Sequence, residues 1–164
     1  MKINATDEYG LRILARIARA EQEEGLSISQ LSELEGLSQS YVAKITRSLR
    51  KHDLINSMRG HKGGYVLARP ADTITINDAL KALGGVLYDS SFCNQHSGQN
   101  NFCSNSLNCS LRSLWRVVQA SLDKILNQIT LQDILTSEKD ANSKLKEIYE
   151  EVFSHSNHLS KIEI

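Results

Sequence analysis

Three cysteines close together in the sequence are the residues with the clearest capacity for chemistry. Cys93, Cys103 and Cys109 are the complete cysteine set of the 164-residue chain, and nine and then five residues separate them. The residues between them are mostly Asn, Ser, Gln and Gly, which predicts an exposed loop. Free cysteine usually behaves as a small buried hydrophobe, so thiols gathered in a polar loop indicate metal binding or redox chemistry.

The compartment expected for this chain bears on the role of these cysteines. No apolar run approaches the roughly 18 residues that a membrane-spanning helix needs. The first ten residues, MKINATDEYG, lack the apolar segment of a secretory signal, so we expect a cytoplasmic protein without a membrane partner. In the cytoplasm an odd number of cysteines favours a metal or redox role over a disulfide framework.

The charge of the chain is unevenly distributed. Lysine and arginine together number 19, as do aspartate and glutamate, so the formal net charge is zero. Between residues 44 and 69, however, seven basic residues accompany the single acid Asp53, which gives 7 − 1 = +6. A basic block in a neutral chain favours a local contact with a polyanion, and an ordinary solvated surface is the alternative.

An amphipathic helix is predicted at the start of the chain. Thr6 or Asp7 can cap it, and its apolar spacing continues to about Ala20. Three basic residues fall on the side opposite the apolar face, where they could contact phosphates or solvent; they are Arg12, Arg16 and Arg19.

Two further helices separated by a tight turn follow. Ser27 with Gln30 predicts a capping box, Leu31 and Leu34 core contacts, and Gly36 the end of the second helix. Ser38 then caps a third helix, so the pair has the helix-turn-helix arrangement, whose second helix enters the DNA major groove. An ordinary helical hairpin is the alternative. The residues on the outer face of the third helix are Ser40, Lys44, Arg47 and Lys51, and those from 38 to 44 are placed to meet base edges.

A basic β-hairpin is predicted directly after the third helix. Residues 54–58 and 65–68 have the composition of two short strands. The glycines between them allow a tight tip, and the cationic residues predict contact with a narrow, electronegative minor groove. The residues of this tip are Arg59, Gly60, His61 and Lys62. A hairpin after a helix-turn-helix makes a winged helix, which supports DNA binding.

The second half of the chain is expected to be helical. Thr75 and Asp78 predict a capping box for a short helix that Gly84 ends. After Cys109, apolar residues recur at helical spacing over about five turns, which favours burial against a second copy. An intrachain core helix is the alternative. Thr130 caps a short helix, residues 137–142 form a polar linker, and a last amphipathic helix follows.

Several of these segments resemble the Rrf-two family of bacterial winged-helix regulators, which includes IscR-, NsrR- and RirA-like members. The similarity covers roughly residues 1–135. The segments that carry it are GLSQSYVAKITRSLRKHDLI, RGHKGGYVLARP, the three cysteines, and CSLRSLWRVV followed by ITLQDIL.

The resemblance implies a homodimer in which Cys93, Cys103 and Cys109 hold an iron–sulfur cluster, 2Fe–2S or 4Fe–4S, whose state sets the affinity for a palindromic operator. By the same resemblance Ser38, Ser40, Tyr41 and Lys44 face the major groove, and Arg59 with the wing tip the minor groove. Two features depart from the family: the first cysteine spacing is longer than usual, and Arg112 stands where the IscR type has a histidine ligand.

The fourth cluster ligand is therefore open. In the NsrR type a carboxylate near the start of the first helix, supplied by the partner subunit, completes the cluster, and Glu8 occupies that position. His96 and Asp7 are the other candidates. A purely structural role of Glu8, as a favourable charge at a helix N-terminus, is the alternative.

Together these features predict a mainly α fold with a small β-wing. It consists of a winged helix-turn-helix domain (1–89), a cysteine loop (90–109), a dimerisation helix region (110–136) and a C-terminal amphipathic helix with its tail (137–164). The predicted function is that of a transcription regulator that senses iron, redox state or nitric oxide.

Three alternatives remain for the cysteines and the last helix. They are a structural zinc site, a cluster-free thiol switch, and a regulator controlled by a partner protein that docks on the last helix. The sequence has no nucleotide-binding glycine signature or nucleophile elbow, so we do not expect an enzyme, although a Cys–His pair with His96 would be the candidate if it were one.

Overall fold

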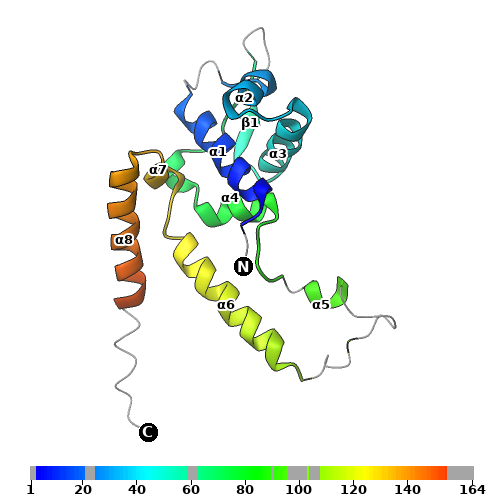
Figure 1. Cartoon of the computed structure of the whole chain (residues 1–164), viewed down its shortest axis with the longest axis vertical. Coiled ribbons are helices and arrows are strands. Elements are labelled where there is room, and N and C mark those ends of the chain that lie inside the picture. The colour runs from blue at the N-terminus through cyan, green and yellow to red at the C-terminus, as the bar shows by residue number, and fades with distance from the viewer. Residues whose placement is uncertain are drawn as a thin grey trace.

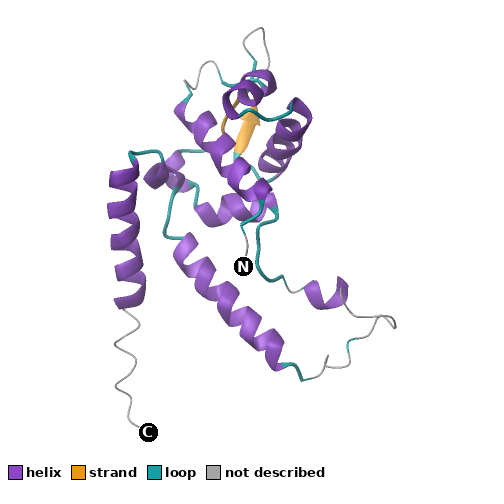
Figure 2. Cartoon of the chain, in the orientation of Figure 1, coloured by secondary structure: helices purple, strands orange, loops and turns teal. Residues whose placement is uncertain are grey.

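The computed structural model describes residues 3–20, 25–58, 63–89, 91–95, 103 and 108–154. A compact head contains the N-terminal elements, while two long helices extend from it (Figure 1). The described elements are mainly helices, with one small sheet (Figure 2), which confirms the predicted fold class. They are α1 (Ala5–Arg19), α2 (Ile28–Glu35), α3 (Gln39–Lys51), β1 (Ile55–Ser57), β2 (Tyr65–Leu67), the 3-10 helix η1 (Ala71–Thr73), α4 (Ile76–Leu83), α5 (Phe92–Gln95), α6 (Ser110–Leu126), α7 (Leu131–Ile134) and α8 (Glu138–Ser154).

The helix-turn-helix unit is α2 and α3, and local capping defines its ends. The Ser27 side chain accepts from the backbone N–H of Gln30, whose own side chain accepts from Ser27 N–H, which is the predicted capping box. Gly36 ends α2 in the left-handed region at φ 66°. Ser38 caps α3 by accepting from the N–H of Tyr41. The prediction for Leu34 is wrong, because 47% of its surface is exposed.

The wing is a two-stranded antiparallel sheet. Ile55 pairs with Leu67 and Ser57 with Tyr65, so both strands lie inside the predicted ranges. Leu26, just before α2, forms an additional bridge to Tyr65 and anchors the wing to the helices. The tip, residues 59–62, lies outside the described residues.

The core of the head is apolar and closely packed. Gly10 of α1 allows α4 to approach, since a Cβ atom at this position would lie 2.3 Å from the Leu83 side chain. Leu131 of α7 is fully buried in the same core, so the chain returns to the head after α6. Two backbone hydrogen bonds, Ile76 N–H to Ile129 and Leu131 N–H to Ile74, fix this return. The fully buried core residues include Ile13, Leu14, Leu31, Val42, Ile45, Leu49, Leu54, Ile55 and Ile74.

The start of α1 differs from the prediction. Asn4 caps this helix by accepting from Asp7 N–H at 2.9 Å, so neither Thr6 nor Asp7 is the cap. The cap thus lies two or three residues earlier than the apolar pattern indicates, and the helix runs from Ala5 to Arg19. Asp7 is instead a buried residue of the first turn. Among the described helices, none combines the length and the apolar character that a membrane crossing requires.

The two long helices, α6 and α8, lie outside the head. No residue of α6 is buried, and it contacts the head through α4. The predicted polar linker at 137–142 is wrong, because α8 begins at Glu138. Ile148 and Val152 of α8 are buried where this helix packs on α6 and α7, whereas Tyr149 and Phe153 form an exposed aromatic pair.

Candidate functional site

The outer face of α3 presents polar and cationic side chains to solvent. Ser38, Ser40, Lys44 and Arg47 are all exposed, as predicted for a recognition helix. The hydroxyl groups of Ser38 and Ser40 lie 3.2 Å apart at the N-terminal end of the helix. The opposite face is buried in the core, so the burial pattern fixes which side of α3 can meet a ligand.

Tyr41 is held from the side of α1. Its hydroxyl shares a hydrogen bond of 3.1 Å with Thr6 Oγ1, and its ring meets the Tyr9 ring edge to face at 6.1 Å between centroids. The predicted base contact of Tyr41 would therefore have to coexist with this link to α1. The four predicted wing-tip residues, Arg59, Gly60, His61 and Lys62, lie outside the described residues.

Two arginines of α1 are committed to an internal ion pair. Glu35 of α2 has a side chain only 1% exposed, and both Arg12 Nε, at 2.6 Å, and Arg16 Nε, at 2.7 Å, approach its two oxygens. The Arg16 contact is a well-formed hydrogen bond, whereas the Arg12 contact is close but poorly directed, so its contribution is mainly Coulombic. These arginines therefore orient α2 against α1, which the sequence did not distinguish from phosphate contacts.

Cys93, in the short helix α5, lies among groups that stabilise its thiolate. The Tyr88 hydroxyl is 3.5 Å from Cys93 Sγ. The pKa of Cys93 is lowered by this hydrogen bond and by the neighbouring Arg112 and Arg116, against a smaller opposing effect of burial. The same hydrogen bond raises the pKa of Tyr88.

Cys109 caps α6, because its Sγ accepts from the backbone N–H of Arg112 at 3.4 Å. Arg112 therefore contacts two thiols, Cys109 through its backbone and Cys93 through its side chain. All three cysteines, including Cys103, are free and half-buried. Within the described ranges, no three side chains of His, Cys, Asp or Glu are gathered closely enough to hold a metal ion.

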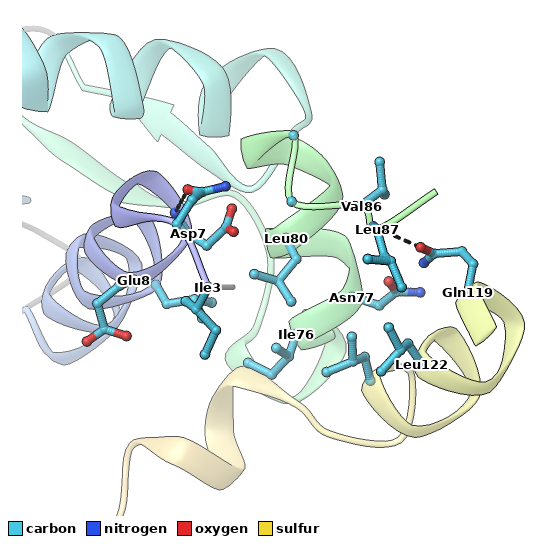
Figure 3. A pocket seen from close by; sticks show the side chains of 15 residues that line it. Ile3, Asp7, Glu8, Ile76, Asn77, Leu80, Val86, Leu87, Gln119 and Leu122 are labelled. Atoms are coloured by element: carbon cyan, nitrogen blue, oxygen red, sulfur yellow. Dashed lines mark hydrogen bonds between the residues drawn. The ribbon is translucent and has the colours of Figure 1, made fainter. Parts of the chain in front are cut away.

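The carboxylate candidates differ in their surroundings. Glu8 is exposed on the first turn of α1, while Asp7 beside it is 7% exposed. Asp7 lines a cavity of about 480 Å³ between α1, α4 and α6, into which apolar side chains such as Leu80 and Leu122 project (Figure 3). His96 lies outside the described residues.

Two residues that the sequence reasoning missed hold the base of the cysteine loop. Gln119 of α6 accepts from the backbone N–H groups of Leu87 and Tyr88 at 2.9 and 3.0 Å. Its amide group in turn donates to Asp123. The signal that could have identified Gln119 is its position as a polar residue on the apolar stripe of α6, between Trp115 and Leu122.

Comparison with known proteins agrees with this arrangement. The family profile described as Rrf2, iron-dependent transcriptional regulator, matches residues 3–137. The HTH-type transcriptional regulator IscR of Sodalis glossinidius (strain morsitans) is 28% identical over 139 residues, which cover 85% of this chain and 81% of that protein.

Solved structures give the same result. The IscR of T. potens has a TM-score of 0.62 and 29% identity, covering 82% of this chain and 86% of that one. The oxidized form of Staphylococcus aureus CymR has a TM-score of 0.61 and 27% identity, covering 84% and 98%. The relatives are transcription regulators and not enzymes. With its winged helix followed by a cysteine loop, the chain belongs to the Rrf2 family of transcription regulators.

Proposed function

We propose that this regulator works as a homodimer whose affinity for a palindromic operator is set by an iron–sulfur cluster bound to Cys93, Cys103 and Cys109. The observation that carries the proposal is the position of three free thiols between the DNA-binding head and α6. They fit a cluster in type and supply three of its usual four ligands, since thiolates are the donors that clusters prefer. Because no three ligands are gathered among the described residues, the cluster would draw the loop together.

The chain's own residues suit this task. Cys109 is the N-cap of α6, and Arg112 contacts both Cys109 and Cys93, so ligation changes at these thiols act directly on the start of α6. The backbone N–H groups of a helix N-terminus also favour a negatively charged ligand. When bound, the cluster supplies iron that responds to iron supply, oxidation or nitric oxide.

Glu8 of the partner is our preferred fourth ligand. Its exposure on the first turn of α1 makes it accessible from outside its own subunit, whereas Asp7 is 7% exposed and lines the cavity between α1, α4 and α6. A ligand from the partner would connect the cluster of one subunit to the DNA-binding head of the other. Release of that ligand would then change the relative orientation of the two heads.

The homodimer is supported by α6. This 17-residue helix buries none of its residues, and its exposed apolar side chains need a cover that the described part of the chain does not provide. They are Leu111, Leu114, Trp115 and Val117. For DNA contact we assign Ser38, Ser40, Tyr41, Lys44 and Arg47 to the major groove, and Arg59, Gly60, His61 and Lys62 to the minor groove.

The test is anaerobic purification followed by an absorption spectrum and assays of iron and acid-labile sulfide. We expect coloured protein with matching iron and sulfide, and loss of both in Cys109→Ser. Glu8→Gln should keep the fold but weaken cluster retention and uncouple cluster state from operator affinity. Glu33→Gln, an exposed glutamate of α2, is the matched control and should behave like the unmodified chain.

A cluster-free thiol switch is the second candidate, because the lowered pKa of Cys93 increases the reactive thiolate fraction. The similarity to a CymR structure determined in an oxidized form also favours it. Colourless protein without iron or sulfide after reconstitution would contradict the cluster. The switch would then predict that mild oxidation changes operator affinity and that Cys93→Ser abolishes this response.

A further inference from the structure

Asp7 is a buried carboxylate with unused hydrogen-bonding capacity. The residue is 7% exposed, and its Oδ1 atom accepts no hydrogen bond from the described residues. Gly85 makes room for this atom, since a Cβ atom there would lie 2.5 Å from Oδ1. Because a buried polar atom without a partner is costly, a position that accommodates one indicates a donor supplied from elsewhere.

The surroundings of Asp7 describe what that donor must look like. The cavity beside it lies between α1, α4 and α6 and measures about 480 Å³. Figure 3 shows Asp7 next to Leu80, with Leu122 on the far wall, so the lining is apolar around this carboxylate. Each of its amide-bearing lining residues already makes a hydrogen bond: Asn4 with the Asp7 N–H, Asn77 with Asn127, and Gln119 with the backbone of residues 87 and 88. The best occupant is therefore an apolar group that carries one hydrogen-bond donor.

On α6, one exposed side chain has this chemistry. Trp115, the single tryptophan, is 43% exposed on α6. Its indole ring is a large apolar body with a single N–H donor and no acceptor. Trp115 precedes Leu122 by seven residues, two helical turns, so both lie on the same side of α6 and the open apolar face adjoins the cavity.

We propose that in the homodimer the α6 helix of a second copy lies across this cavity and that the partner's Trp115 donates its indole N–H to the Asp7 carboxylate. The inference rests on the proposed homodimer and names the contact that fixes its geometry. By twofold symmetry Asp7 of each subunit receives the partner's Trp115, so each dimer contains the contact twice.

Two geometric arguments agree with this placement. If the two α6 helices cross antiparallel near Val118, the midpoint of 115 and 122, the partner's Trp115 lies opposite Leu122, which lines the cavity. Separately, if Glu8 reaches the partner's cysteines, the start of the partner's α6 lies beside α1. Trp115 is six residues beyond Cys109, or about 9 Å along the helix at 1.5 Å per residue. Both arguments bring the indole to the end of α1 that carries Asp7.

The decisive experiment mixes two complementary full-length variants. One chain carries Asp7→Leu and the other Trp115→Phe, so each homodimer lacks both contacts, whereas the heterodimer keeps one intact Asp7–Trp115 pair. A hydrogen bond to a charged group corresponds to roughly a tenfold effect on the dissociation constant. We expect the heterodimer to bind roughly tenfold more tightly than either homodimer, measured by sedimentation equilibrium of differently tagged chains.

Two further measurements keep the test informative if Asp7→Leu folds poorly. Asp7→Asn keeps the shape and one acceptor oxygen and should weaken the homodimer less than Trp115→Phe, for which we expect roughly 100-fold because both contacts are lost. Emission from the single tryptophan should also shift to shorter wavelength as the unmodified chain dimerises. Asp72→Leu, at an exposed acid, is the matched control and should change neither the dissociation constant of the dimer nor the wavelength of the tryptophan emission.

The outcomes separate this inference from the proposed function. A stable dimer that keeps solvent-exposed tryptophan emission, or in which the two variants combine without heterodimer preference, overturns the Asp7–Trp115 contact and leaves the cluster-controlled dimer standing. A chain that stays monomeric at every concentration overturns both. Binding of a small amine or an unrelated protein in the cavity of the intact dimer would also contradict the inference, because the indole would then not occupy it.

Discussion

The helices α1 and α6 have similar lengths and opposite environments. Both are amphipathic, with 15 and 17 residues, yet α1 buries six residues whereas α6 buries none. The apolar side chains of α1 meet α3, α4 and the wing, while those of α6 mostly face solvent. Helical apolar spacing therefore predicts that a face needs cover, but it does not say whether the same chain supplies it.

A core truncation on α1 should produce the largest effect. Leu14 is fully buried, so Leu14→Ala removes packed methyl groups and leaves a cavity. We expect the free energy of unfolding of the head to fall by about 2–5 kcal/mol, measured by urea denaturation. A change below about 1 kcal/mol would show that the α1 face is not the rigid core described here.

A substitution on the apolar face of α6 should instead leave the head folded. Leu114 is 51% exposed, and Leu114→Glu places a charge on the open apolar face. We expect loss of dimerisation and at least a roughly 100-fold weaker operator affinity, since both half-sites are then no longer bound together. Sedimentation and operator titration provide the measurement. Ser113→Glu, at an exposed polar position of the same helix, should preserve the dimer.

An intermediate effect is expected at the ion pair between α1 and α2. Glu35→Ala removes the buried carboxylate, but Arg12 and Arg16 remain 47% and 42% exposed and can be hydrated. The expected loss of unfolding free energy is therefore about 2 kcal/mol, below the cost of stranding a fully buried charge. Glu33→Ala, on the exposed side of α2, should stay within about 0.5 kcal/mol of the original chain.

The smallest effect concerns the start of α4. Burial alone would raise the pKa of Asp78, but hydrogen bonds from Arg69 and Thr75 outweigh it and lower this pKa. A depressed pKa in the folded state stabilises the protein above the unfolded value and is lost as the pH falls through the folded value. Because both partners are about two fifths exposed, Arg69→Gln should cost only a few tenths of a kcal/mol at neutral pH. In thermal unfolding, the difference in stability between the original chain and Arg69→Gln should become smaller below about pH 4.

Local sequence signals predicted the head well. The capping boxes at Ser27 and Thr75, the left-handed Gly36 and the wing strands all depend on contacts within a few residues, and the structure confirms them. The errors have physical causes. Asn4 was overlooked as a cap because the apolar pattern begins later, and the polar stretch at 137–142 is the exposed first turn of α8.

The candidate site was less accessible to sequence reasoning. The link from Arg112 to both Cys93 and Cys109 depends on how the loop meets α6, and spacing alone does not encode that. The buried state of Asp7 likewise follows from the approach of Gly85, 78 residues away in sequence. The cluster, its fourth ligand and the dimer stay predictions because they need a cofactor and a second chain.

The Arg12–Glu35–Arg16 pair also has a consequence for counterions. Since the single Glu35 carboxylate offsets one of these two guanidinium charges, the group releases fewer ions on DNA binding than two free arginines would. On α3 the exposed cations number four per head, Lys44, Arg47, Arg50 and Lys51. Eight such charges in a dimer limit the contribution of α3 to the slope of log affinity against log salt concentration to about −7. The ionic strength of the medium therefore tunes this regulator through α3 and the cationic residues proposed for the wing tip, while the apolar packing of the head stays unchanged.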